Sequence, residues 1–214
     1  GVAVDGFVMR VGMDADLTAF AREVDAWGAA RGLAMDVHLR IAANNPAANI
    51  RDDQAILRAV VELYAAALAT PRVTMLVDPF MDIDRGYFVR HGLIDRRCNL
   101  RAAGMAVESL TAYLGDAAGV GLPVTLDAGN VGGARVLTLR RPDRMARIVL
   151  AQAGEEIALG AELKAGFAAP ALIVPLDQPW VTAPDQGLAL TAQTGRWSSH
   201  IKGPVMLVGA QGER

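Results

Sequence analysis

The chain has 214 residues, a formal net charge of −2 and an apolar content of 52%. This apolar content is enough for one large domain or two small ones, and it excludes a disordered chain. No lysine and arginine stripe is present, aromatic residues make up only 5%, and no apolar run reaches the roughly 20 residues that cross a bilayer, so neither nucleic-acid binding nor membrane insertion is expected.

The first half of the chain alternates predicted strands and helices. Val2 to Val11 is a nearly continuous apolar run, which is typical of a strand buried on both faces in a parallel sheet. Asp14 or Asp16 can cap the helix that follows, and Gly32 ends it. Leu33 to Ile41 predicts the second strand.

The same alternation continues after a polar loop. Asp52 or Asp53 opens a second helix, and Pro71 lies just beyond its end. Val73 to Val77 predicts a third strand, and a long polar loop leads from it to a helix from about Arg101 to Leu114. This order implies parallel strands that are joined by right-handed crossovers.

After Gly121 the pattern changes to short β-like runs separated by glycine and proline. About seven runs of this kind predict a sandwich, and Gly129 to Gly133 predicts a hairpin turn rather than a phosphate-binding loop. We place the boundary near residues 116 to 122, with residues 1–116 as an α/β domain and residues 121–214 as a small β-sandwich-like domain. The runs are residues 124–127, 135–140, 147–151, 156–159, 171–176, 188–191 and 204–208.

Four short segments of the first half have a specific order and spacing. They are Val4-Asp5-Gly6-Phe7, Gly32-Leu33, Gln54 with Tyr64, and Gly92-Leu93-Ile94-Asp95 with Asn99 and Arg101-Ala102. Together they resemble the C-terminal portion of clan A glycoside hydrolases, most of all family 10, the xylanase-like (β/α)8 barrels. The resemblance implies that residues 1–116 are the last three βα units of a TIM-type barrel.

Three βα units cannot close a barrel, and an open sheet of apolar strands leaves its edges exposed. We therefore expect an N-terminal barrel half in the same protein or in a partner chain. The start of the chain almost inside a predicted strand points the same way.

The catalytic residues of the resembled family are not matched. Its nucleophilic glutamate ends strand seven, where this sequence has Val37-His38-Leu39-Arg40. Retaining glycoside hydrolysis needs two carboxyl groups about 5 Å apart, one of them the nucleophile. Met9-Arg10 stands in the region of the family's strand-six histidine, and Asp78-Pro79 in that of the tryptophan after strand eight. The resemblance thus implies the barrel without the family's usual chemistry.

Active sites of such barrels lie at the C-terminal ends of the strands, so the residues just past the three strands should converge. His38 is a candidate general acid/base because imidazole titrates near neutral pH, and it shares a strand face with Arg40 and Asp36. The candidate catalytic residues are His38, Asp78, Asp82 and Asp84, and the candidate substrate-binding residues are Arg10, Arg40, Arg85 and Tyr87.

Arginines around one pocket favour an anionic small molecule or oligosaccharide, because guanidinium binds carboxylate or phosphate through paired hydrogen bonds. A sugar acid, its lactone or a uronate-containing glycan fits better than neutral xylan. The alternative is that the arginines pair with Asp36, Asp82 and Asp84 in structural salt bridges. A lone strand histidine is likewise often structural.

No cofactor is expected. Asp78, Asp82 and Asp84 offer oxygen ligands for a divalent metal, but the pattern lacks the glycine and glutamate of an EF-hand loop. The favoured alternative is a loop held by side-chain-to-backbone bonds and an Asp–Arg pair.

The second half contains few candidates. Trp180 and Trp197 either form a carbohydrate-stacking platform or pack in the core. Ser198-Ser199-His200 is interpreted as a polar turn, and Cys98, the chain's one cysteine, has no matched partner motif. The arginine-rich, lysine-poor composition is typical of GC-rich bacterial genomes. The sequence does not decide the cellular compartment, and the bacterial cytoplasm is favoured.

The sequence predicts a carbohydrate-active hydrolase of an acidic sugar or sugar-acid derivative, either a lactone or a glycoside. Lactone hydrolysis suits the missing nucleophile, since an activated water and a cationic oxyanion partner suffice. The segments at residues 84–88 and 92–97 also loosely resemble sugar-lactone hydrolases of the apionate type. The alternative is a catalytically inactive carbohydrate-binding barrel protein.

Overall fold

The structure, a computed structural model, describes residues 4–42, 45, 47–115, 123–142, 144–152, 155–168, 171–178 and 200–212. The chain forms two compact units, Gly1–Val107 and Glu108–Arg214, and their boundary falls within helix α3 (Ala102–Leu114). The boundary predicted at residues 116–122 lies outside the described residues. None of the described helices is long and apolar enough to cross a membrane.

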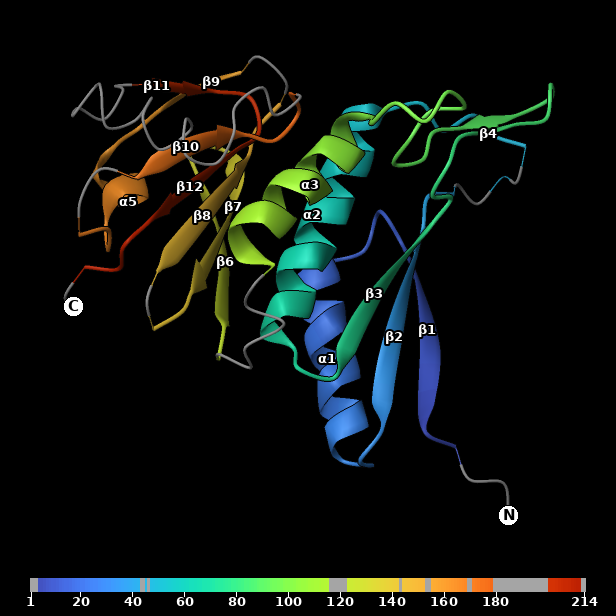
Figure 1. Ribbon diagram of the computed structural model, residues 1–214, viewed down its shortest axis with the longest axis horizontal. Coiled ribbons are helices and arrows are strands. Elements are labelled where there is room, and N and C mark those ends of the chain that lie inside the picture. The colour runs from blue at the N-terminus through green and yellow to red at the C-terminus, as the bar shows by residue number, and fades with distance from the viewer. Residues whose placement is uncertain are drawn as a thin grey trace. The chain divides into compact units, whose positions relative to one another are not determined.

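The first unit contains a parallel sheet in the order β1-β2-β3 (Figure 1). Its strands are β1 (Gly6–Gly12), β2 (Ala34–Arg40) and β3 (Val73–Asp78). Helix α1 (Leu17–Ala29) connects the first two strands, and α2 (Asp53–Ala69) connects the last two. The predicted alternation of strands and helices, with parallel pairing, is confirmed.

Both crossover helices are capped by aspartates that were predicted as capping residues. Asp16 Oδ1 accepts a hydrogen bond from the Ala19 backbone N–H at 2.9 Å. Asp52 Oδ1 accepts from the N–H groups of Gln54 and Ala55 at 3.1 and 2.9 Å. Such caps bind N–H groups that lack a partner inside the helix. Of the alternatives at each helix start, Asp16 and Asp52 are therefore the capping residues.

The two faces of the sheet differ in burial. On β2, Met35, Val37 and Leu39 are fully buried, on the face that the crossover helices cover. On the same face of β1, the ring of Phe7 packs edge-on against Trp27 of α1, with centroids 5.5 Å apart. The even-numbered residues of β2 are half-buried or exposed. Since side chains alternate along a strand, these residues lie on an uncovered face.

Strand β1 is more exposed than its apolar sequence predicts. Gly6 to Arg10 are all exposed, with 55% of Val8 and 43% of Met9 accessible. Among the described strands, β1 pairs only with β2, so its outer edge is open. The prediction of a strand buried on both faces is wrong here, because β1 has one neighbouring strand and a helix on one face.

The long loop after β3 contains a hairpin that the sequence did not reveal. Its strands are β4 (Ile83–Asp84) and β5 (Val89–Arg90). At the turn, the Arg85 N–H donates to the Phe88 carbonyl at 3.1 Å, and Gly86 has a φ of 77°, which favours glycine. Two-residue strands are too short to show an alternating pattern.

The second unit contains two antiparallel sheets, one in the order β10-β12-β8-β7-β6 and one that pairs β11 with β9. The predicted turn is confirmed: Gly132 and Gly133, with φ of 57° and 87°, join β6 to β7. His200 belongs to β11 and not to a polar turn, while the run at 188–191 lies outside the described residues. The strands are β6 (Thr125–Val131), β7 (Ala134–Arg140), β8 (Met145–Leu150), β9 (Glu156–Ala158), β10 (Leu172–Pro175), β11 (His200–Lys202) and β12 (Val205–Gly209).

The core of the second unit lies between its two sheets. Val136 and Val149 of the large sheet belong to one buried cluster with Ile157 and Ile201 of the small sheet. Leu163, from the short helix α5 (Ala161–Lys164), completes it. The unit is thus two sheet layers that share an apolar core.

Candidate functional site

The C-terminal ends of the parallel strands bring four predicted site residues to one face. Arg10 of β1 lies beside His38 of β2 in register, and Arg40 of β2 lies beside Asp78 of β3. All four belong to the uncovered face, opposite the buried residues of β2. We call Arg10, His38, Arg40 and Asp78 the open group.

His38 and Asp78 form the titratable pair of the open group. His38 Nε2 lies 4.0 Å from Asp78 Oδ2, with 20% of the histidine and 55% of the aspartate side chain accessible. This is longer than a hydrogen bond, so the two side chains face each other without a direct hydrogen bond. The Asp78 carbonyl accepts from the Ile41 N–H at 2.8 Å, which fixes the end of β3 against β2.

The arginines of the open group are available to a ligand. Arg10 and Arg40 are exposed, and neither forms an ion pair with a residue that the structure describes. The alternative prediction, in which Asp36, Asp82 and Asp84 hold these arginines in salt bridges, is wrong within the described residues: other arginines pair with Asp82 and Asp84, and Asp36 forms no ion pair there.

Asp82 lies in a half-buried ion pair instead. Arg101 donates from Nε to Asp82 Oδ1 at 2.7 Å and from Nη2 to Oδ2 at 2.5 Å. The Gly92 N–H donates to the same carboxylate at 3.0 Å, of which 8% is accessible. Burial alone would raise the pKa of Asp82, but these hydrogen bonds outweigh it and hold the pKa below the ordinary 3.8.

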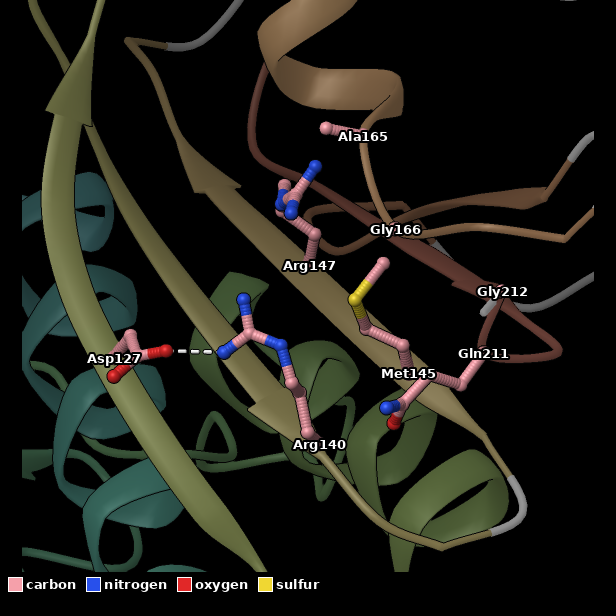
Figure 2. Close-up of a pocket in the computed structure, with 8 residues that line it drawn as sticks. All are labelled: Asp127, Arg140, Met145, Arg147, Ala165, Gly166, Gln211 and Gly212. Carbon is pink, nitrogen blue, oxygen red and sulfur yellow. Dashed lines mark hydrogen bonds and ion pairs between the residues drawn. The ribbon is translucent and has the colours of Figure 1, made fainter. Parts of the chain in front are cut away.

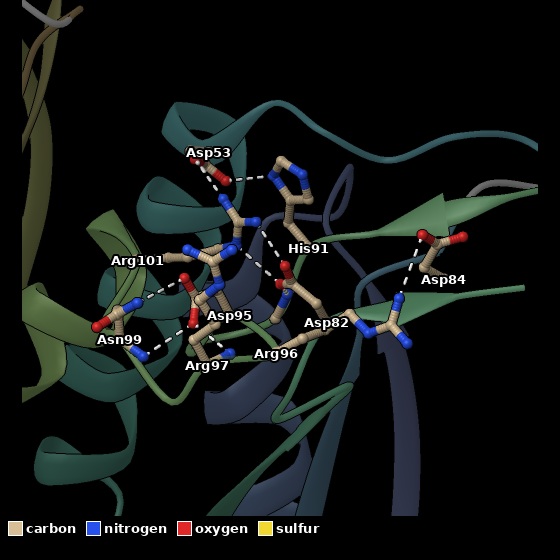
Figure 3. Close-up of polar contacts among 10 residues, drawn as sticks. Asp53, Asp82, Asp84, His91, Asp95, Arg96, Arg97, Asn99 and Arg101 are labelled. Carbon is tan, nitrogen blue, oxygen red and sulfur yellow. Dashed lines mark hydrogen bonds and ion pairs between the residues drawn. The ribbon is translucent and has the colours of Figure 1, made fainter. Parts of the chain in front are cut away.

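The ion pair extends into a larger network, drawn in Figure 3. Arg101 Nη1 lies 3.3 Å from Asp53 Oδ2, and Asp53 Oδ1 lies 2.7 Å from His91 Nδ1. We call Asp53, Asp82, His91 and Arg101 the closed network. It ties the start of α2 to the hairpin loop and to the residue before α3. The sequence does not reveal this network, because its members lie up to 48 residues apart.

Asp84, Arg85 and Tyr87 lie on the β4–β5 hairpin. Asp84 accepts from the Gly86 N–H at 2.9 Å and lies 3.4 Å from Arg96 Nη1. Tyr87 is 70% exposed. Among the described residues, no hydrogen bond or ion pair joins these three side chains to the open group.

The aspartates of the loop form no metal site in the described part of the chain. There, no three His, Cys, Asp or Glu side chains gather where a metal ion could bind. Asp82 and Asp84 are each turned toward an arginine, as the Asp–Arg alternative predicts. Trp180 and Trp197 lie outside the described residues.

The fold is similar to that of a family 39 glycoside hydrolase from the gut symbiont Bacteroides cellulosilyticus WH2, with a TM-score of 0.51 and 11% identity. The match covers 96% of this chain and 44% of that one, so the chain spans less than half the length of that hydrolase. The sequence matches no family model and no curated protein. The likeness shows a mixed α/β, glycoside-hydrolase-like fold; the more specific resemblance to family 10 stays a prediction.

Proposed function

Starting from this glycoside-hydrolase-like fold, we propose that the protein is a carbohydrate-active hydrolase whose active site is the open group. The observation that carries the proposal is the His38–Asp78 pair, 4.0 Å apart at the ends of β2 and β3. Ligands of parallel α/β sheets bind at this end of the strands. A histidine beside a carboxylate is suited to general acid–base catalysis.

The substrate that suits the open group is an acidic sugar or a sugar-acid derivative. Arg10 on the neighbouring strand and Arg40 two residues along β2 place positive charge next to His38 on the uncovered face. Their planar guanidinium groups bind carboxylate oxygens in pairs, which favours a uronate, a sugar acid or its lactone over a neutral glycan.

Lactone hydrolysis uses these residues without a carboxylate nucleophile. His38 takes a proton from water, and the water oxygen attacks the lactone carbonyl carbon. The resulting oxyanion faces the guanidinium of Arg40, while Asp78 stabilises the imidazolium. When the ring C–O bond breaks, His38 returns its proton to the departing alkoxide, which gives the open hydroxy acid.

We further propose that the first unit is the last part of a TIM-type barrel, with additional βα units in the same protein or in a partner chain. Among the described strands, β1 and β3 each pair only with β2, so two strand edges are open. The uncovered face includes Leu76, which is 41% exposed. Closure would place this face in the barrel interior, and the 44% coverage of the hydrolase chain leaves room for such units.

A second candidate function is carbohydrate binding without catalysis. It is favoured by the end of β2, where the family 10 resemblance places a glutamate and the chain has His38-Leu39-Arg40. The same arginines would bind an acidic sugar in such a protein. Turnover distinguishes the two functions, since both predict binding.

The test is to incubate the full-length natural protein with a panel of sugar lactones and uronate-containing oligosaccharides. We expect turnover of at least one acidic member, and His38→Ala should lower it by at least about 100-fold. The control His200→Ala, in β11 of the second unit, should leave turnover unchanged. Turnover that survives His38→Ala would remove His38 from the mechanism, and binding without turnover across the panel would favour the second function.

A further inference from the structure

A pocket of about 480 Å³ lies over one face of the large sheet in the second unit. Its charged side chains come from three adjacent strands: Asp127 of β6, Arg140 of β7 and Arg147 of β8 (Figure 2). Gly166 and Gly212 line it from the chain segments beyond the sheet. The pocket thus has a charged floor, and its wall includes two glycines that are joined by a hydrogen bond from the Gly212 N–H to the Gly166 carbonyl at 2.8 Å.

Strand register places these charges together. Asp127 lies beside Thr138, and Thr138 lies beside Arg147, so the three residues form one row across the strands. Arg140 is two residues from Thr138 and therefore shares its face. Two guanidinium groups consequently meet on one side of the sheet.

Arg147 is a buried cation that the described chain does not neutralise. Only 6% of it is accessible. Its Nε donates to Thr138 Oγ1 at 3.1 Å, and its Nη1 donates to the carbonyls of Glu162 and Leu163 at 2.9 and 2.6 Å. Within the described residues, Nη2 makes no hydrogen bond and no carboxylate lies within ion-pair distance. Buried charges are usually paired, so the pocket lacks a counter-charge.

The neighbouring charges do not remove this excess. Arg140 forms an ion pair with Asp127, so these two side chains offset each other. Burial lowers the pKa of the Arg147 guanidinium, and the positive charge of Arg140 lowers it further, while Glu162 opposes the shift. An anion in the pocket would favour the charged form of Arg147 and so oppose both effects.

We propose that this pocket binds a small hydroxylated organic anion, whose carboxylate or phosphate group lies between Arg140 and Arg147. Guanidinium groups recognise either oxyanion through paired N–H donors. A volume of about 480 Å³ admits a molecule larger than a bare ion. The amide of Gln211, also in the lining, and the carboxylate of Asp127 can hydrogen-bond hydroxyl groups. The site uses residues of the second unit alone, so it does not depend on the proposed hydrolase.

The test is calorimetric titration of the full chain with glucuronate, glucose 6-phosphate and glucose. We expect at least one of the two anions to bind, with an affinity that falls as salt is added, and glucose not to bind. The tighter anion identifies the recognised group as carboxylate or phosphate. Equal binding of glucose, or no binding of either anion, would overturn the proposal.

Substitutions locate the binding. Arg140→Gln should weaken it by about tenfold or more. Asp127→Asn should strengthen anion binding, because it removes the carboxylate that pairs with Arg140. The Asp127 side chain is 71% exposed, so the substitution removes little else. Arg135→Gln is the matched control, since it removes the same charge from the opposite face of β7. Anion binding that ignores Arg140→Gln and Asp127→Asn but is lost in Arg40→Gln would place the anion at the open group and contradict the proposal.

Discussion

The first unit contains two groups of the same residue types that are held very differently. In the closed network, Arg101 lies between the carboxylates of Asp82 and Asp53, and 8% of the Asp82 side chain is accessible. In the open group, His38 and Asp78 stand 4.0 Å apart, and the arginines form no ion pair within the described chain. Histidine, aspartate and arginine are present in both groups, so these residue types alone do not indicate a candidate site. The open group is the candidate because its arginines have no ion-pair partner among the described residues and can bind a ligand.

The largest expected effect distinguishes two aspartates by stability. Asp82→Asn should lower the free energy of unfolding by about 2 kcal/mol, because it leaves the half-buried Arg101 without its main partner. Asp78→Asn should change it by less than about 0.5 kcal/mol, because that side chain is 55% exposed. Urea denaturation of both variants measures the difference. Similar losses in the two variants would contradict the comparison.

The next effect concerns the arginines of the open group. Arg10→Gln should raise the KM for an anionic substrate by about tenfold, because one charge-assisted contact is lost. The unfolding free energy should stay unchanged, since Arg10 is exposed. Steady-state kinetics with an acidic and a neutral substrate measure the effect. A rise in KM of the same size for the neutral substrate would argue against anion recognition by Arg10.

The closed network should also make the protein sensitive to acid. The folded pKa of Asp82 lies below its ordinary value of 3.8, so its contribution to stability is present above about pH 3.8 and is lost as the pH falls through the folded pKa. Between about pH 6 and pH 3, wild type should therefore lose more unfolding free energy than Asp82→Asn. Urea midpoints at the two pH values measure this loss; parallel losses would assign the acid sensitivity to other groups.

The smallest effect is expected at the hairpin. Arg96 and Asp84 lie 3.4 Å apart, but 65% and 41% of their side chains are accessible. Such exposed pairs contribute little, so Arg96→Gln should cost less than about 0.5 kcal/mol in the denaturation assay. If Arg96→Gln lowers the unfolding free energy almost as much as Asp82→Asn, the Arg96–Asp84 pair belongs to the closed network.

The sequence predicted the parts of the fold that local patterns encode. Apolar spacing and capping aspartates located both crossover helices, and Gly132-Gly133 marked a hairpin turn. The hairpin after β3, helix α5 and strand β11 were missed, because these elements have only two to four residues; β9 and β10 are as short but lie in β-like runs that were predicted. Burial of β1 was overestimated, since a sequence does not show which neighbours a strand has.

The candidate sites show the same limit. Strand alternation predicted that His38 and Arg40 share a face, which the register confirms. Which aspartate pairs with which arginine was not predictable, because Asp82 and Arg101 are 19 residues apart. Arg147 did leave a signal: it is a charged residue within the otherwise apolar run of β8.

The imidazole signals of the intact protein test the central claim most directly. The chain has three histidines, one in the open group, one in the closed network and one in β11. In a nuclear magnetic resonance titration with glucuronate, we predict that the His38 signal shifts and that the His91 signal does not. A shift of the His91 signal without a shift of the His38 signal would contradict the assignment of the open group as the active site.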